Sequence, residues 1–137
     1  MEEKIRIENV TKKFGSYAAL DGISLNFEKG KVHGIIGRNG SGKTVLFKCI
    51  CGFLRVDGGA VLVDGKQIGK EIEAPESIGA IIETPGFLPG YSARQNLQFL
   101  AGIRGKIGKK EIDEAIRKVG LDPEAKKHVG KYSLGIR

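Results

Sequence analysis

A loop rich in glycine constrains the fold of this chain more than any other segment. It runs from Gly37 to Thr44, and its residues fit the pattern G-x-x-x-x-G-K-[ST] at every fixed position. The apolar run at residues 32–36 predicts a buried strand before the loop, and the apolar run at residues 45–50 predicts a buried helix after it. A strand, a glycine loop and a helix in this order indicate a Walker A loop, which binds phosphate groups.

The residue types within the loop suit a phosphate group. Glycine at positions 37, 40 and 42 lets the backbone approach a phosphate without a clash from a Cβ atom. The N–H groups of the loop and of the following helix form an anion site. Lys43 can reach the β- and γ-phosphates of a nucleotide, and the Thr44 hydroxyl can ligate Mg²⁺, so the predicted cofactors are ATP and Mg²⁺. The predicted binding residues in this loop are Gly37, Arg38, Asn39, Gly40, Ser41, Gly42, Lys43 and Thr44.

The chain also carries a net positive charge. Lys and Arg number 23 against 16 Asp and Glu, which gives a formal net charge of +7. The basic residues are spread along the chain and form no stripe interleaved with aromatic residues, so we interpret them as a solvated surface and expect no direct contact with nucleic acid. The side chains of Arg38 and Lys48 are assigned to this surface.

The cysteines, the N-terminus and the apolar runs bear on where the chain works. Cys49 and Cys51 are two residues apart on the predicted helix and cannot pair, and unpaired cysteines are typical of a reducing cytoplasm. The N-terminal residues lack the apolar core of a signal peptide. The apolar runs are far shorter than the ~20 residues of a membrane-spanning helix, so any membrane role is expected to come through a partner.

Further segments predict a small sheet followed by helices. The pair Asp64-Gly65 predicts a tight hairpin turn. Ser92 and Gln95 have the spacing of a capping box, which predicts a helix that ends near Gly102. Strands are expected at residues 4–8, 23–27, 60–63 and 78–82. A second helix is predicted by the apolar face of Ile112, Ala115, Ile116 and Val119.

Several segments, taken in order, resemble a known family. One of them, residues 19–25, reads A-L-D-G-I-S-L, and the others are residues 10–15, 58–65, 78–83, 93–97 and 132–137. With the Walker A loop they resemble the first half of an ABC-type ATPase, the nucleotide-binding subunit of an ABC transporter. The resemblance implies an incomplete α/β fold of the P-loop NTPase type, with an antiparallel β subdomain, a Walker A strand, loop and helix, and a partial helical subdomain.

The resemblance also implies a division of the chain into domains. Residues 1–90 are expected to form the nucleotide-binding part with the Walker A loop. Residues 91–137 are expected to form a partial helical subdomain that ends inside the family's signature motif.

Individual residues gain roles from the same resemblance. Phe14 stands where an aromatic ring stacks on adenine, with Tyr17 as a second candidate, and the alternative for Phe14 is packing at a strand end. Glu83 stands where the family has a Gln that contacts Mg²⁺ or its water, and the alternative is an exposed loop carboxylate. Ser133 and Gly135 match the signature motif, which faces the γ-phosphate of a nucleotide on an opposing subunit.

The sequence departs from the family's pattern in two motifs. Glu83 replaces the usual Gln, and the signature reads Y-S-L-G-I in place of L-S-G-G-Q. The combination of I-E-x-P-G-F with Y-S-L-G resembles the branch that exports bacitracin and lantibiotics or gives immunity to them.

No catalytic set of the family is complete within these residues. The Walker B strand with its acidic residues, the D-loop and the switch histidine would follow Arg137. We therefore expect that the chain alone does not turn over ATP, and that Lys43 supplies only charge that stabilises the transition state. Parallel strands that flank the Walker A strand would also follow, so residues 32–36 and 78–82 are expected to expose unpaired edges.

The resemblance finally implies a function and partners. The expected function is ATP binding by the energising subunit of an ABC transporter, with hydrolysis driving transport in the complete protein. The expected partners are a transmembrane permease subunit and a second nucleotide-binding subunit in a homodimer-like pair, with the chain in the cytoplasm, peripheral on the inner face of the cell membrane. Two alternatives are a non-transport ABC-type ATPase that acts on nucleic acid or the ribosome, and a truncated nucleotide-binding or interaction module without turnover.

Overall fold

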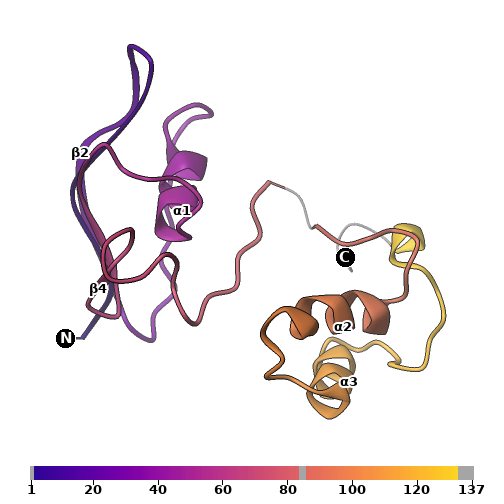
Figure 1. Cartoon of the computed structure of the whole chain (residues 1–137). Helices are drawn as coiled ribbons and strands as arrows, with labels where there is room; N and C mark the ends of the chain where they lie inside the picture. The colour runs from indigo at the N-terminus through magenta and orange to yellow at the C-terminus, as the bar shows by residue number, and fades with distance from the viewer. Residues whose placement is uncertain (1, 84–85, 133–137) are drawn as a thin grey trace. The chain divides into compact units, whose positions relative to one another are not determined.

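The computed structural model describes residues 2–83 and 86–132 of the chain (Figure 1). These cluster into two units, Met1–Glu83 and Thr84–Arg137. The domain division expected after residue 90 stays a prediction. The expected signature residues Ser133 and Gly135 lie outside the described residues.

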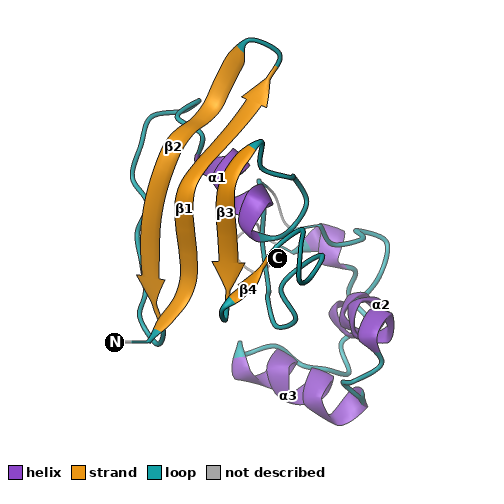
Figure 2. Cartoon of the chain, turned by 60° about the vertical axis from the view of Figure 1, so that its left-hand side comes forward, coloured by secondary structure: helices purple, strands orange, loops and turns teal. Residues whose placement is uncertain are grey.

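An antiparallel sheet forms most of the first unit (Figure 2). Its strands lie in the order β2-β1-β3-β4. The bounds are β1 (Glu3–Phe14), β2 (Tyr17–Glu28), β3 (Gly58–Val63) and β4 (Lys66–Gln67). The first three contain the strands expected near residues 4, 23 and 60, but β1 and β2 are longer. They continue to the turn because Phe14 pairs with Tyr17 across it, and backbone hydrogen bonding extends the ladder whatever the side-chain pattern.

The turn between β3 and β4 has the expected hairpin geometry. Asp64 has φ of 51° and Gly65 has φ of 78°. A two-residue type I′ turn requires positive φ at both central residues, and Asp-Gly is one of the pairs that tolerate it. The predicted hairpin is therefore confirmed.

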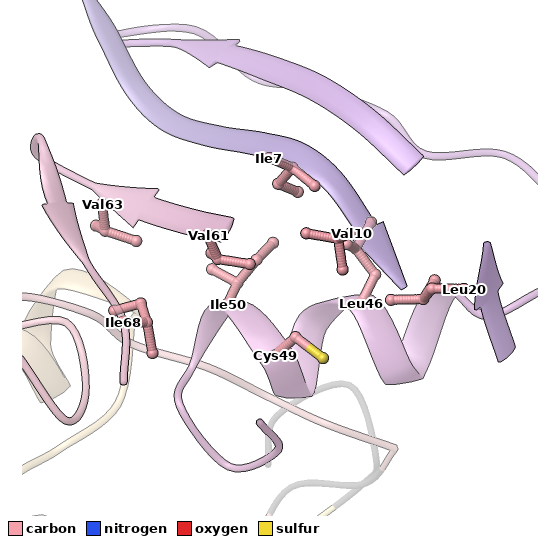
Figure 3. Close-up of a cluster of buried hydrophobic side chains, with 9 residues drawn as sticks. All are labelled: Ile7, Val10, Leu20, Leu46, Cys49, Ile50, Val61, Val63 and Ile68. Carbon is pink, nitrogen blue, oxygen red and sulfur yellow. The ribbon is translucent and has the colours of Figure 1, made fainter. Parts of the chain in front are cut away.

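The core of the first unit lies between the sheet and helix α1 (Lys43–Ile50) (Figure 3). Ile7 and Val10 of β1 are both buried, although regular alternation would place them on opposite faces. A bulge lies between them, where Asn9 has φ of 46°, and it shifts the phase of the strand. The buried side chains of this cluster are Ile7, Val10, Leu20, Leu46, Cys49, Ile50, Val61, Val63 and Ile68.

Two apolar runs that were expected as strands have no regular secondary structure. Residues 32–36 and 78–82 are irregular, and Val32 and Ile36 are fully exposed. A strand needs a neighbour that takes up its backbone hydrogen bonds, and within the described residues neither run joins the sheet. The expected Walker A strand is therefore wrong for this structure. The expected exposure holds for Val32, Ile36, Ile78 and Ile81, whereas Ile35 packs partly against the core.

The second unit contains two helices that lie side by side, α2 (Ala93–Arg104) and α3 (Lys109–Lys118) (Figure 1). A short 3-10 helix, η1 (Val129–Lys131), follows them. The predicted capping box begins α2, because the Gln95 N–H donates to the Ser92 hydroxyl at 3.2 Å and the Ser92 N–H donates to the Gln95 side chain at 3.0 Å. Among the described residues, no helix has both the length and the apolar composition to cross a bilayer.

Helix α3 buries only part of the predicted apolar face. Ile112 and Ile116 are buried, but Ala115 and Val119 are exposed. Asp113 is buried instead, because its carboxylate accepts two hydrogen bonds from the Arg94 guanidinium of α2, at 2.8 Å and 2.9 Å. The contact between α2 and α3 thus contains an ion pair beside the apolar side chains of Ile112 and Ile116.

Candidate phosphate-binding site

The loop at residues 37–44 contains a tight turn. The Ser41 N–H donates to the Arg38 carbonyl at 3.1 Å, which closes a four-residue turn. Gly40, the third residue of that turn, has φ of 81°, as a type II turn requires. Gly42 follows with φ of 95°, and a Cβ atom there would lie 2.4 Å from the Ala19 carbonyl oxygen. Glycine is therefore required where the loop meets β2.

Helix α1 begins directly after this turn and leaves its first N–H groups available. Gly42 is the N-cap residue, and no side chain caps the helix. The first turn contains no acidic residue. The first N–H groups of a helix have no acceptor within the helix, and the helix dipole places partial positive charge at the same end. The start of α1 can therefore bind an anion.

The Lys43 side chain folds back over the loop. Its ammonium group donates hydrogen bonds to the Gly37 carbonyl and, at 3.4 Å, to the Arg38 carbonyl. An ammonium group has three donors, so it can bind a phosphate oxygen while it stays near these carbonyls. Lys43 thus adds a full positive charge to the partial charge of the helix end.

A pocket of about 400 Å³ lies beside the loop and is lined by residues of the first unit. Phe14 and Tyr17, at the turn between β1 and β2, lie along it with ring-bearing side chains that are 48% and 57% exposed. The Lys12 ammonium lies 5.5 Å from the centroid of the Phe14 ring. The lining residues are Phe14, Tyr17, Ala19, Asn39, Gly40, Ser41, Gly42, Lys43, Thr44 and Val45.

The structure thus brings most of the predicted binding residues to one place. Phe14 and the loop from Asn39 to Thr44 share the pocket, whereas Gly37 and Arg38 contribute carbonyl acceptors for Lys43. The Thr44 hydroxyl group belongs to a pocket residue and is an oxygen ligand of the kind that Mg²⁺ prefers. The residues present therefore fit a nucleotide phosphate with a bound magnesium ion.

Glu83 lies elsewhere on the first unit. Its carboxylate is 3.9 Å from the Lys48 ammonium in the last turn of α1, and its side chain is 70% exposed. It is not among the residues that line the pocket. Glu83 has φ of 69°, which is uncommon for a residue other than glycine. Its role toward magnesium stays a proposal.

The Tyr17 hydroxyl makes a contact with the loop that the sequence did not predict. The Tyr17 hydroxyl donates a hydrogen bond to the Gly40 carbonyl at 3.1 Å. Sequence analysis considered Tyr17 only as another ring for adenine. The available signal was the two residues, Gly15 and Ser16, that separate Phe14 from Tyr17, because a tight hairpin turn of this length places Phe14 and Tyr17 opposite each other at one end of the sheet.

Comparison with known proteins shows which family the chain resembles along its length. A family model described as "ABC transporter" matches residues 20–137. The chain is 39% identical over 133 residues to the uncharacterized ABC transporter ATP-binding protein YybJ of Bacillus subtilis, covering 97% of the chain and 61% of that protein. It is 38% identical over 138 residues to the bacitracin transport ATP-binding protein BcrA of Enterococcus faecalis, covering 100% of the chain and 45% of BcrA.

A solved structure gives the same result for the fold. The structure of cbiO1 from Clostridium perfringens, described as part of the ABC transporter complex cbiONQ, matches with a TM-score of 0.80 and 28% identity. The match covers 98% of this chain and 57% of cbiO1. The chain thus spans only about half of the length of the relatives it matches. The α/β fold class expected from the sequence is confirmed, as part of a nucleotide-binding domain.

Proposed function

The chain belongs to the ABC transporter family, and from that premise we propose that it binds ATP through the loop at residues 37–44. The observation that carries the proposal is one pocket that combines an uncapped helix N-terminus, the Lys43 ammonium and an exposed aromatic ring. The helix end and Lys43 are suited to the triphosphate. Phe14 is suited to the base, because an aromatic ring offers a stacking surface to a purine.

We assign each group of the site one task toward the nucleotide. The N–H groups at the start of α1 hold the β-phosphate, and Lys43 holds the β- and γ-phosphates and neutralises charge that develops between them. Thr44 supplies an oxygen ligand for Mg²⁺, with Glu83 as a further candidate. Mg²⁺ held there would neutralise part of the charge on the phosphates.

The larger assembly belongs to the same proposal. The chain acts as the energising subunit of a transporter on the inner face of the cell membrane, with a permease subunit and a second nucleotide-binding subunit as partners. In the complete protein, water cleaves the bond between the β- and γ-phosphates, and Ser133 and Gly135 keep the signature role that the family resemblance gives them, toward the γ-phosphate of the opposing subunit. The names of the relatives support this role, because BcrA is a bacitracin transport protein and cbiO1 is part of a transporter complex. BcrA also supports the peptide-antibiotic branch suggested by the sequence.

The decisive experiment compares Lys43 with a lysine of the first unit that lies outside the pocket. Lys43→Ala removes a charge-assisted phosphate contact, so we expect ATP to bind at least tenfold more weakly, a loss of about 1.4 kcal/mol. Lys66→Ala is the control, because it removes the same charge from β4, outside the pocket. Calorimetric titration with ATP and Mg²⁺ measures both. If the two variants bind ATP as the parent does, the loop is not the nucleotide site.

A further inference from the structure

We propose that Tyr17 is a positioning residue for the phosphate loop, separate from any contact with the base. Its hydroxyl holds the peptide that joins Gly40 to Ser41 in the orientation of the turn, through the 3.1 Å hydrogen bond to the Gly40 carbonyl. The inference rests on the proposed function, because it assigns a further residue to the same site.

The peptide between Gly40 and Ser41 is held at both of its polar ends. A trans peptide is planar, so the Gly40 carbonyl and the Ser41 N–H point in opposite directions from one rigid group. Tyr17 donates to the carbonyl, and the Arg38 carbonyl accepts from the N–H at 3.1 Å. The loop itself supplies one of these hydrogen bonds, and β2 supplies the other.

Gly40 is the residue of the loop that most needs such a restraint. It has φ of 81°, and no atom lies within 4 Å of the position that a Cβ would take. Glycine rotates freely about its backbone bonds, and open space around it leaves that rotation unhindered. Without the Tyr17 hydroxyl, the Gly40–Ser41 peptide keeps only the hydrogen bond from within the turn.

The turn is coupled to the charged group of the site. The Arg38 carbonyl accepts a hydrogen bond from Ser41 and also lies 3.4 Å from the Lys43 ammonium, so one acceptor serves both. A turn that rotates at Gly40 changes the surroundings of Lys43. Loss of the Tyr17 hydroxyl should therefore weaken binding of the phosphates, whatever base is attached.

Tyr17 is well placed to act as an anchor. It begins β2 and pairs with Phe14 of β1, and Leu20 three residues later is buried in the core. The backbone of β2 also meets the loop at Gly42, where a Cβ atom would collide with the Ala19 carbonyl. The Tyr17 ring is 57% exposed, so its hydroxyl is the part that contacts the loop while the ring contributes little to the core.

The test separates the phosphate from the base. The ligands are ATP and inorganic tripolyphosphate, each titrated with Mg²⁺ into the whole chain. Tyr17→Phe removes only the hydroxyl. We expect it to lower the affinity for both ligands by the same factor, about fivefold. Tyr91→Phe in the second unit is the matched control and should leave both affinities unchanged.

A second readout distinguishes positioning from general support of the fold. In the chain without ligand, hydrogen exchange of the Ser41 amide should be faster in Tyr17→Phe, because its peptide loses one restraint. Exchange of the Leu46 amide, which donates to the Gly42 carbonyl at 2.9 Å inside α1, should not change. Equal acceleration at both amides would mean that Tyr17 only stabilises the unit, and it would overturn the inference.

The remaining outcomes are also decisive. Unchanged affinity for tripolyphosphate in Tyr17→Phe, or a loss confined to ATP, refutes the positioning role. Lys43→Ala in the same assay separates the two proposals. If Lys43→Ala binds tripolyphosphate as the parent does, the proposed function fails and this inference fails with it. If Lys43→Ala binds tripolyphosphate more weakly than the parent and Tyr17→Phe does not, only the role of Tyr17 fails.

Discussion

The two units of the chain are stabilised by different kinds of contact. In the first unit, α1 packs on the sheet through a cluster of apolar side chains, from Ile7 on β1 to Ile50 at the end of the helix. In the second unit, the contact between α2 and α3 includes buried polar groups. Arg94 binds Asp113 and also Glu124, and it holds the pKa of the Glu124 carboxyl below its usual value.

A second buried polar side chain of the helical unit is also fully paired. Asn96 is buried, and its side-chain oxygen accepts a hydrogen bond from the Leu88 N–H at 2.7 Å. Its amide donates to the Leu88 carbonyl at 3.1 Å, so one side chain satisfies both backbone groups of a loop residue. Paired polar groups are therefore buried in this unit together with the apolar side chains of Ile112, Ile116 and Val129.

The apolar packing of the first unit also positions the candidate site. Apolar packing holds the start of α1 against β2, and the loop at residues 37–44 is placed by that packing. A phosphate site needs N–H groups fixed in direction, because a displaced donor loses most of its hydrogen bond. A packed core supplies this rigidity without any ligand.

The largest effect should come from the apolar core. Ile7→Ala deletes a side chain that is 1% exposed, so it should destabilise the first unit by about 2–5 kcal/mol. Hydrogen exchange of the β1 and β3 amides measures that loss. Ile103→Ala on α2 is the control, because Ile103 is 79% exposed and its loss should cost less than about 0.5 kcal/mol. A comparable loss from both variants would contradict the assigned cores.

The next largest effect should come from the buried ion pair. Arg94→Met leaves the buried Asp113 carboxylate without its partner, so the second unit should lose about 1–3 kcal/mol. Exchange of the α2 and α3 amides should become faster, and that of β1 should not.

Two variants test whether polar pairing is the cause. Arg117→Met removes an exposed guanidinium from α3 and should have little effect. The double variant Arg94→Met with Asp113→Leu should recover part of the loss, because no buried charge is left unpaired. If the double variant is less stable than Arg94→Met alone, the buried charge is not the cause.

The third effect concerns nucleotide binding, which should involve only the first unit. Substitution of Phe14 tests how much of the ATP affinity comes from stacking on the base. Phe14→Ala removes the stacking surface and should weaken the binding of ATP by about 1 kcal/mol, while inorganic tripolyphosphate binds as before. Phe14→Tyr keeps a ring and should retain ATP affinity. Titration of both ligands measures the difference, and equal weakening of both would assign Phe14 to the loop instead of the base.

The smallest effect is expected at the proposed metal contact. Glu83→Gln removes a carboxylate, so the gain in ATP affinity that Mg²⁺ produces should fall by roughly threefold. Titrations with and without Mg²⁺ measure that gain, and Glu114→Gln on α3 is the control. Identical magnesium dependence in the parent and Glu83→Gln would leave Glu83 as a partner of Lys48 only.

Much of the candidate site could be predicted because its residues are close in sequence. Lys43 and Thr44 follow the glycines of the loop directly, and the pattern contains their chemistry. Phe14 came from family resemblance, and the pocket now places it beside the loop. The Tyr17 hydroxyl could not be predicted, because its acceptor on Gly40 is 23 residues away and the hydrogen bond exists only once β2 packs beside the loop.

The sequence by itself determined the elements whose causes are local. The capping box at Ser92 and the hairpin turn at Asp64 depend on residues within one turn, through hydrogen bonds and allowed φ values. Tertiary structure decided the rest. Residues 32–36 are apolar enough for a strand, but a strand exists only where another segment accepts its hydrogen bonds, and within the described residues none does. Likewise Val119 belongs to the predicted apolar face but lies just after the end of α3 and is exposed, whereas the polar Asp113 is buried, because the Arg94 guanidinium of α2 pairs with its carboxylate.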